Sequence, residues 1–186
     1  MAKDKRDFDE EVAQTEREEE EQARSVLDEI DKQRKKAKRE GLNFTAPSER
    51  QLRRKLGRHN SPMIIFQSWT GSVAPGGTIN YTVGINNPDP VTVIWLFIHV
   101  FVGAANAVRN VGDALATVDP RFPRLTLPDF AGLSIAPGVT TSLNFQLSVP
   151  GGVEATNYLG NSFLFQADWH DVGTHFDRGV FVFEVT

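Results

Sequence analysis

From residue 61 to the C-terminus, apolar and polar residues alternate in short runs, the pattern that half-buried β-strands produce. The clearest run is Thr78–Asn86, whose inward-facing residues would be Ile79, Tyr81, Val83 and Ile85. Further strands are predicted at Met63–Trp69, Thr140–Val149, Asn161–Trp169 and Gly179–Val185. Together with Val91–Val102, and with the apolar segment Leu133–Ile135 that leads into Thr140, this makes about seven strands separated by turn residues, without a β-α-β rhythm. The sequence therefore predicts a mainly β, immunoglobulin-like antiparallel sandwich over residues 61–186.

The run Val91–Val102 differs from the others because apolar residues occupy both of its faces. Its β-branched and aromatic residues favour a central strand, covered by the second sheet and by the N-terminal arm or a neighbouring subunit. A short buried helix is the competing interpretation. The run is too short for a membrane-spanning helix, which needs about 20 apolar residues.

The connections carry weaker signals. Residues 103–130 lack a regular pattern, and their prolines exclude a continuous helix. Asp171–Arg178 is predicted to join the last two strands into a terminal hairpin.

Residues 7–40 contain neither glycine nor proline and are rich in helix-forming side chains, and Gly41 is a plausible residue to end the helix. Val26, Leu27 and Ile30 make one short apolar stripe, but Glu18–Glu21 interrupts any heptad repeat. The pattern favours a solvated helix. A coiled coil or a helix-docking segment is the alternative, and disorder is the third.

A short second helix is predicted from Thr45 to Leu56, ending at Gly57. Thr45 would cap its first turn, which tolerates Pro47. Leu52 and Leu56 would share one face, surrounded by basic residues.

Charge divides the chain into an arm, residues 1–60, and a low-charge sandwich domain, residues 61–186. Residues 1–31 hold 13 Asp and Glu against 5 Lys and Arg, whereas residues 32–58 hold 11 Lys and Arg against 2 Glu. The basic segment could contact nucleic acid, an anionic membrane surface or an acidic groove, or it could be a solvated linker or neutralise the acidic half. Since Phe44 is its single aromatic residue, any nucleic-acid contact would be made to the backbone. The candidate contact residues are Lys32, Arg34, Lys35, Lys36, Lys38, Arg39, Arg50, Arg53, Arg54, Lys55 and Arg58.

Two motifs support a family resemblance. Val73–Val83 with Asn86-Asn87-Pro88, and Leu133–Thr140 with its Pro-Gly turn, resemble segments of bacterial and archaeal immunoglobulin-like sandwiches of the cell-adhesion-related type. The resemblance covers roughly residues 62–186. It implies the sandwich fold and an adhesion or extracellular carbohydrate role. This chain departs from the family pattern in having one copy, a charged arm and no secretory signal.

The one cluster with chemical potential lies near the C-terminus. Imidazole and carboxylate groups bind divalent metals, and a hairpin could bring them together, although ordinary turn residues explain the same cluster. The weak metal-ligand candidates are Asp168, His170, Asp171, His175 and Asp177. A triad that joins Ser148 or Ser162 to His170 has no nucleophile motif to support it. The chain has no cysteine, and its glycine-rich turns lack the Lys-Ser/Thr of a phosphate loop, so we expect no cofactor and no enzymatic activity.

We expect a cytoplasmic structural or interaction protein that assembles with itself or docks another protein. The alternatives are a nucleic-acid-associated or shell-forming protein that uses residues 32–58, and a metal-dependent binder that uses residues 168–177.

Overall fold

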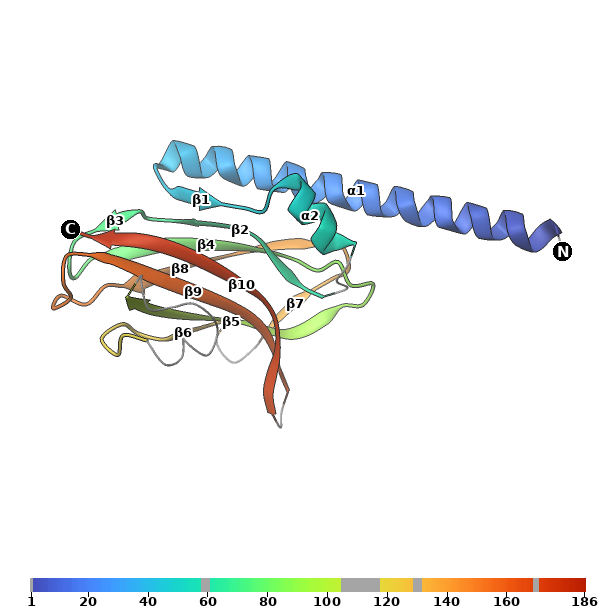
Figure 1. Cartoon of the computed structure of the whole chain (residues 1–186). Helices are drawn as coiled ribbons and strands as arrows, with labels where there is room; N and C mark the ends of the chain where they lie inside the picture. Colours follow the sequence, from blue (N-terminus) through green and yellow to red (C-terminus); the bar gives the residue numbers. More distant parts are fainter. Residues whose placement is uncertain (1, 58–60, 105–117, 129–131, 169–170) are drawn as a thin grey trace.

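The computed structural model describes residues 2–57, 61–104, 118–128, 132–168 and 171–186. Two β-sheets pack face to face, and a long helix lies along the outside of one of them (Figure 1). The four-stranded sheet has the order β1 (Asn43–Thr45), β2 (Met63–Trp69), β4 (Thr78–Asn86) and β8 (Thr140–Ser148). The mainly β sandwich that the alternation predicted is therefore confirmed.

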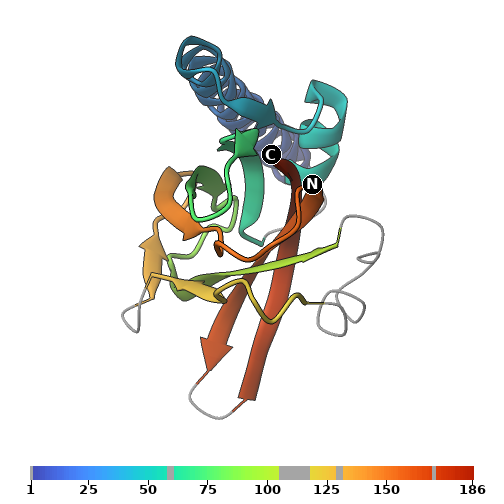
Figure 2. The same cartoon turned by 90° about the vertical axis from the view of Figure 1, so that its left-hand side faces the viewer.

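The six-stranded sheet pairs the first strand of the C-terminal hairpin with the central strand. Its order is β3 (Ser72–Val73), β10 (Asp171–Val185), β9 (Asn157–Asp168), β5 (Val93–Ala104) and β6 (Leu125–Leu127), with β7 (Leu133–Ile135) also pairing with β5. Among the described pairs, only β3 and β10 run parallel. Figure 2 shows the two layers from the end of the sandwich.

The main core lies between the sheets. Ile79, Tyr81, Val83 and Ile85 are almost completely buried in it, as the alternation in β4 predicted. Tyr81 also brings a hydroxyl into this core, where it contacts Gln67 Oε1 and lies 2.6 Å from Ser162 Oγ. Burial raises the pKa of Tyr81, so the phenol stays neutral and its hydrogen bonds tie the two sheets together.

The terminal hairpin is longer than predicted. The segment Asp171–Arg178 is not a connection but the first half of β10, because β9 and β10 pair from Asp168↔Asp171 to Asn157↔Glu184. Two irregularities in this register lie between Asp171 and Thr174 and between His175 and Asp177. The segment Asp171–Arg178 is rich in polar residues, which hid the strand from a prediction based on apolar alternation.

The prediction that the arm covers the outer face of Val91–Val102 is wrong, because the arm packs on β2 instead, whereas cover by a neighbouring subunit stays a prediction. β5 is a central strand, but only its inner residues, including Leu96, Ile98 and Val100, are fully buried. The outward-facing Phe97, His99 and Phe101 are half-buried. The strand that is covered on both faces is β2, in which all seven residues are buried.

Helix α1 (Ala2–Glu40) is the element that covers β2. Val26 and Ile30 pack with Leu52, Met63, Ile65 and Phe66 into a second apolar cluster on the outside of the four-stranded sheet. The favoured prediction of a purely solvated helix is therefore wrong, and the docking alternative holds for its C-terminal half. One short apolar stripe is enough to dock the helix on the sheet, because β1 follows the helix directly and anchors it beside β2.

The prediction that Gly41 ends the first helix is confirmed at the C-terminus of α1. Gly41 adopts a positive φ of 68°, Gly41 N donates to Lys38 O, and Leu42 N donates to Ala37 O over 2.9 Å. This is a glycine-terminated helix end that satisfies the last carbonyl groups.

Helix α2 (Glu49–Leu56) begins later than predicted. Ser48, not Thr45, caps it, through a capping box with Gln51, while Thr45 ends β1. Thr45 pairs with Gln67 in the sheet and so is committed to strand geometry. Leu52 is fully buried and Leu56 partly so, which confirms the predicted apolar face.

Candidate functional site

The outer face of the six-stranded sheet gathers aromatic side chains that the main core does not use. We call this surface the aromatic face. It consists of Phe97, His99 and Phe101 of β5, Phe163 and Phe165 of β9, Val180 and Val182 of β10, and Arg124 and Arg178 at its margins.

Strand register explains why these rings meet. Phe97 lies opposite Phe165 and His99 lies opposite Phe163 across the β5–β9 pair. The rings of Phe97 and Phe165 stack at 5.6 Å between centroids, and those of His99 and Phe165 lie 4.3 Å apart. Phe101 contacts Phe163 at 5.9 Å. Cross-strand aromatic contacts of this kind hold the side chains in fixed positions, so the face is preorganised.

Two arginines border the rings. The Arg124 guanidinium lies 5.9 Å from the centroid of Phe101, and that of Arg178 lies 5.5 Å from Phe163. Arg178 Nε also donates to Asn161 Oδ1 over 2.9 Å. The guanidinium groups are thus held over ring faces, an arrangement that is favourable for both partners.

His99 is the titratable group of the aromatic face. Its Nδ1 lies 3.2 Å from Thr126 Oγ1 of β6. Burial lowers the pKa of His99, because the imidazolium form would lose water. At neutral pH the ring is therefore neutral and contributes apolar surface to the face.

The residues of the aromatic face include no carboxylate and no lysine. At the edge, Val180 and Val182 are 40% and 42% exposed. Such a set offers ring faces, branched apolar groups and two fixed cations, but no paired acid and base. Its chemistry suits binding.

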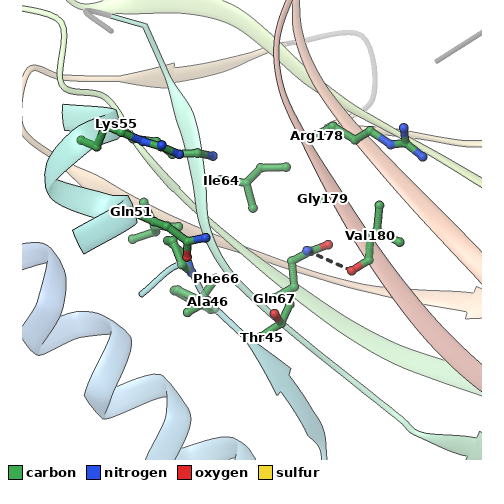
Figure 3. A pocket seen from close by; sticks show the side chains of 13 residues that line it. Thr45, Ala46, Gln51, Lys55, Ile64, Phe66, Gln67, Arg178, Gly179 and Val180 are labelled. Atoms are coloured by element: carbon green, nitrogen blue, oxygen red, sulfur yellow. Dashed lines mark hydrogen bonds between the residues drawn. The ribbon is translucent and has the colours of Figure 1, made fainter. Parts of the chain in front are cut away.

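A second concave feature lies where the arm meets the hairpin. A cleft of about 390 Å³ opens between α2 and β10, lined by Gln51 and Lys55 on one side and by Gly179 and Val180 on the other (Figure 3). Ile64, Phe66 and Gln67 of β2 lie between them, and Gln67 Nε2 reaches the carbonyl of Val180.

The polar contacts at this cleft hold the fold together. Lys55 Nζ lies 2.7 Å from Asp177 Oδ2, and the same carboxylate oxygen accepts from the backbone N–H of Ile64 at 3.0 Å. Arg178 points away from Lys55 in Figure 3, toward its contacts on the aromatic face. Asp177 thus links α2, β2 and β10, and the cleft has a structural explanation.

The predicted metal cluster is only partly described. His170 lies outside the described residues, as do the side chains of Asp168, Asp171 and His175, and Asp177 is occupied by Lys55. No group of three or more metal-ligating side chains occurs among the residues that are described. The metal site stays a prediction. For the triad, Ser162 is buried between the sheets beside Tyr81, whereas Ser148 is exposed at the end of β8.

The basic segment is divided between two helices. Six of its cations lie on the last turns of α1, Arg50 to Lys55 lie on α2, and Arg58 is outside the described residues. Arg53 is paired with Glu20 and Glu49, and Lys55 with Asp177. Phe44 stacks on Phe66 at 5.9 Å and lies 5.5 Å from the Arg34 guanidinium. Base stacking by Phe44 would require these contacts to break, whereas contact of the basic residues with a nucleic-acid backbone stays a prediction.

Sequence reasoning missed the aromatic face as a site. The odd-numbered residues from Phe97 to Phe101 and from Phe163 to Phe165 alternate with core residues in both strands. Aromatic residues that alternate with apolar core residues in two strands were the available signal, but their pairing needed the register of β5 and β9.

No known protein family matches this chain, and no curated protein sequence matches it either. Solved structures do resemble its fold. The C-terminal domain of Wzt has a TM-score of 0.52 at 9% identity, over 78% of each chain. At this identity the likeness is one of fold, and it confirms the β-sandwich architecture.

Two further solved structures are more distant. The CARDB domain of a Pyrococcus furiosus protein, in complex with di-metal ions, has a TM-score of 0.41 at 14% identity, over 68% of this chain and 86% of that chain. A sporulation control protein from Bacillus subtilis has a TM-score of 0.42 at 11% identity, over 68% of this chain and 50% of that chain. No helix in the described part of the chain is long and apolar enough to span a membrane.

Proposed function

We propose that this chain is a non-enzymatic protein-interaction module that docks a partner protein through the aromatic face of its six-stranded sheet. The observation that carries the proposal is the arrangement of fixed rings with bordering arginines. The charged arm packs on the four-stranded sheet and covers the apolar residues on its outer face.

The composition of the aromatic face supports a protein partner. Interface centres are enriched in aromatic residues and arginine and depleted of lysine and carboxylates. Rings that are already packed against one another lose little conformational entropy on binding, which favours affinity. Low charge is also a property of the whole domain, since residues 61–186 carry 13 of the 44 charged side chains.

A photo-crosslinking amino acid at Val182, which is 42% exposed on the aromatic face, provides the test. The matched control carries it at Thr156, an exposed residue in the loop before β9. A protein captured from the native cell only at Val182 is then purified, and its affinity for the full chain is measured by calorimetry.

We expect Val182→Glu to weaken that affinity at least about 10-fold, because a carboxylate would be desolvated at the interface, while Thr156→Glu leaves it unchanged. Equal binding by the two variants would overturn the proposal. Crosslinks between copies of the chain alone would overturn the choice of partner and identify the aromatic face as a self-association surface.

A further inference from the structure

Helix α1 is far longer than its docking site. Its buried residues run from Ala23 to Ala37, whereas its N-terminal half extends beyond the sandwich (Figure 1). Residues 7–21 of this projecting half carry nine Asp and Glu and one Arg. A polar helix that leaves its own domain is typical of one that contacts another domain or chain.

A groove follows α1 at the middle of its length. It has a volume of about 860 Å³ and lies between α1 and the turn Gly138–Thr140. The lining residues from α1 are Glu21, Arg24, Ser25, Asp28, Glu29 and Lys32, and Val139 on the opposite wall is 44% exposed. The groove therefore combines acidic and basic side chains with one exposed apolar contact.

We call the α1 residues that line the groove the charged stripe. The charges of this stripe are complementary to those of a second copy of α1 that runs in the opposite direction. If two copies of α1 lie antiparallel with a two-fold axis between Val26 and Leu27, residue i faces residue 53 − i of the other copy, by simple counting along the helix. Glu21 then faces Lys32, and Arg24 faces Glu29.

The same alignment continues beyond the groove. Glu18 faces Lys35 and Gln14 faces Arg39, whereas Arg17 and Lys36 make the one like-charged pair in this stretch. The two-fold axis falls within the groove, whose α1 residues run from 21 to 32. Within one copy, Glu20 already pairs with Arg53 at 2.5 Å, so the acidic half of α1 does bind basic helix surface in this molecule.

We infer that this chain forms a homodimer in which α1 of a second copy lies antiparallel in the groove between α1 and the Gly138–Thr140 turn. The acidic half of each helix contacts the basic half of the other, and Val139 packs against the partner helix. This surface is separate from the aromatic face, so the dimer would present two aromatic faces.

The interface depends on exposed ion pairs, which are weak singly and screened by salt. We expect the full chain to be dimeric at about 50 mM NaCl and to dissociate at about 500 mM, as measured by sedimentation equilibrium. The variants E18K/E21K and K32E/K35E should each be monomeric at low salt, because each places like charges opposite one another.

Mixing these two variants provides the decisive step. In the mixed pair every reversed residue faces an opposite charge, so a 1:1 mixture should form a heterodimer although neither variant dimerises alone. The control R50E/R54E makes a charge reversal of the same size on α2, outside the stripe, and should dimerise like the natural chain. A mixture that stays monomeric, or a control that loses the dimer equally, would overturn the proposal.

Helix direction is tested separately. The chain has no cysteine, so Gln14→Cys and Arg39→Cys can be introduced without background. The antiparallel pair predicts a disulfide in the mixture of the two variants and not in either alone, because the two copies of position 14 would be about 37 Å apart along the axis. A disulfide-linked dimer of the Gln14→Cys variant alone would contradict the inference by showing a parallel pair.

Discussion

The two outer faces of this sandwich show different solutions to the same problem. On the four-stranded sheet, Met63, Ile65 and Phe66 point outward and are sealed by α1 and α2, so all are at most 3% exposed. On the six-stranded sheet, Phe97 and Phe101 also point outward, yet they are half-buried; both pack with neighbouring rings, and Phe101 also packs with the Arg124 guanidinium. We infer from this contrast that the arm is a structural cover for one sheet and that the other sheet's apolar surface is left for binding.

Removal of the arm should have the largest effect on folding, because it uncovers the outer face of the four-stranded sheet. A chain that starts at Ser61 lacks β1 and exposes the apolar side chains that Val26, Ile30 and Leu52 cover. We expect it to aggregate or to lose its cooperative thermal transition, measured by calorimetry. The control lacks only residues 2–12 of the projecting end and should keep its Tm within about 3 °C. An intact transition in the chain from Ser61 would show that the cover is dispensable.

A matched pair of ring deletions measures the same contrast at single residues. Phe66→Ala removes a ring that is 1% exposed and should lower the free energy of unfolding by about 3–5 kcal/mol. Phe101→Ala removes a half-buried ring and should cost about 1 kcal/mol. Urea denaturation of both variants measures the difference. Equal costs would mean that the two faces are buried to the same extent.

Loss of the ion pair between Lys55 of the arm and Asp177 of the hairpin should have a smaller effect on stability. Lys55→Met breaks the pair with Asp177, whose side chain is 18% exposed and also accepts from Ile64 N–H. We expect a loss of about 1 kcal/mol, since Lys55 is 35% exposed and water screens the pair. The exposed Lys36→Met should change stability by less than about 0.5 kcal/mol in the same urea experiment. A Lys55→Met variant as stable as this control would show that the Lys55–Asp177 pair does not stabilise the fold.

The smallest expected effect is a pH dependence from His99. Burial lowers its pKa, so the folded state takes up a proton less readily than the unfolded chain. The stability that neutral His99 contributes is present above the ordinary value of 6.5 and is lost as the pH falls below it. We expect His99→Gln to flatten the fall in unfolding free energy between about pH 7.5 and about pH 5. Parallel curves for the two proteins would contradict a buried, neutral His99.

Local pattern was enough to predict most of the fold but not the site. Strands β2 and β4 match their predicted bounds, because turn residues flank both strands and strict alternation marks β4. The arm's docking was not predictable from α1 alone, since Val26 and Ile30 find their partners on α2 and β2. The aromatic face likewise needed the pairing of β5 with β9, which only the register of distant strands supplies.

The most direct test of the contrast between the two faces is hydroxyl-radical footprinting of the full chain at high salt, with phenylalanine oxidation rates read by mass spectrometry. Comparing one residue type removes differences in intrinsic reactivity. We predict that Phe97 and Phe101 oxidise several-fold faster than Phe66, which the arm covers. Rates for Phe97 and Phe101 as low as that of Phe66 would contradict the account, because the aromatic face would then be closed to any partner.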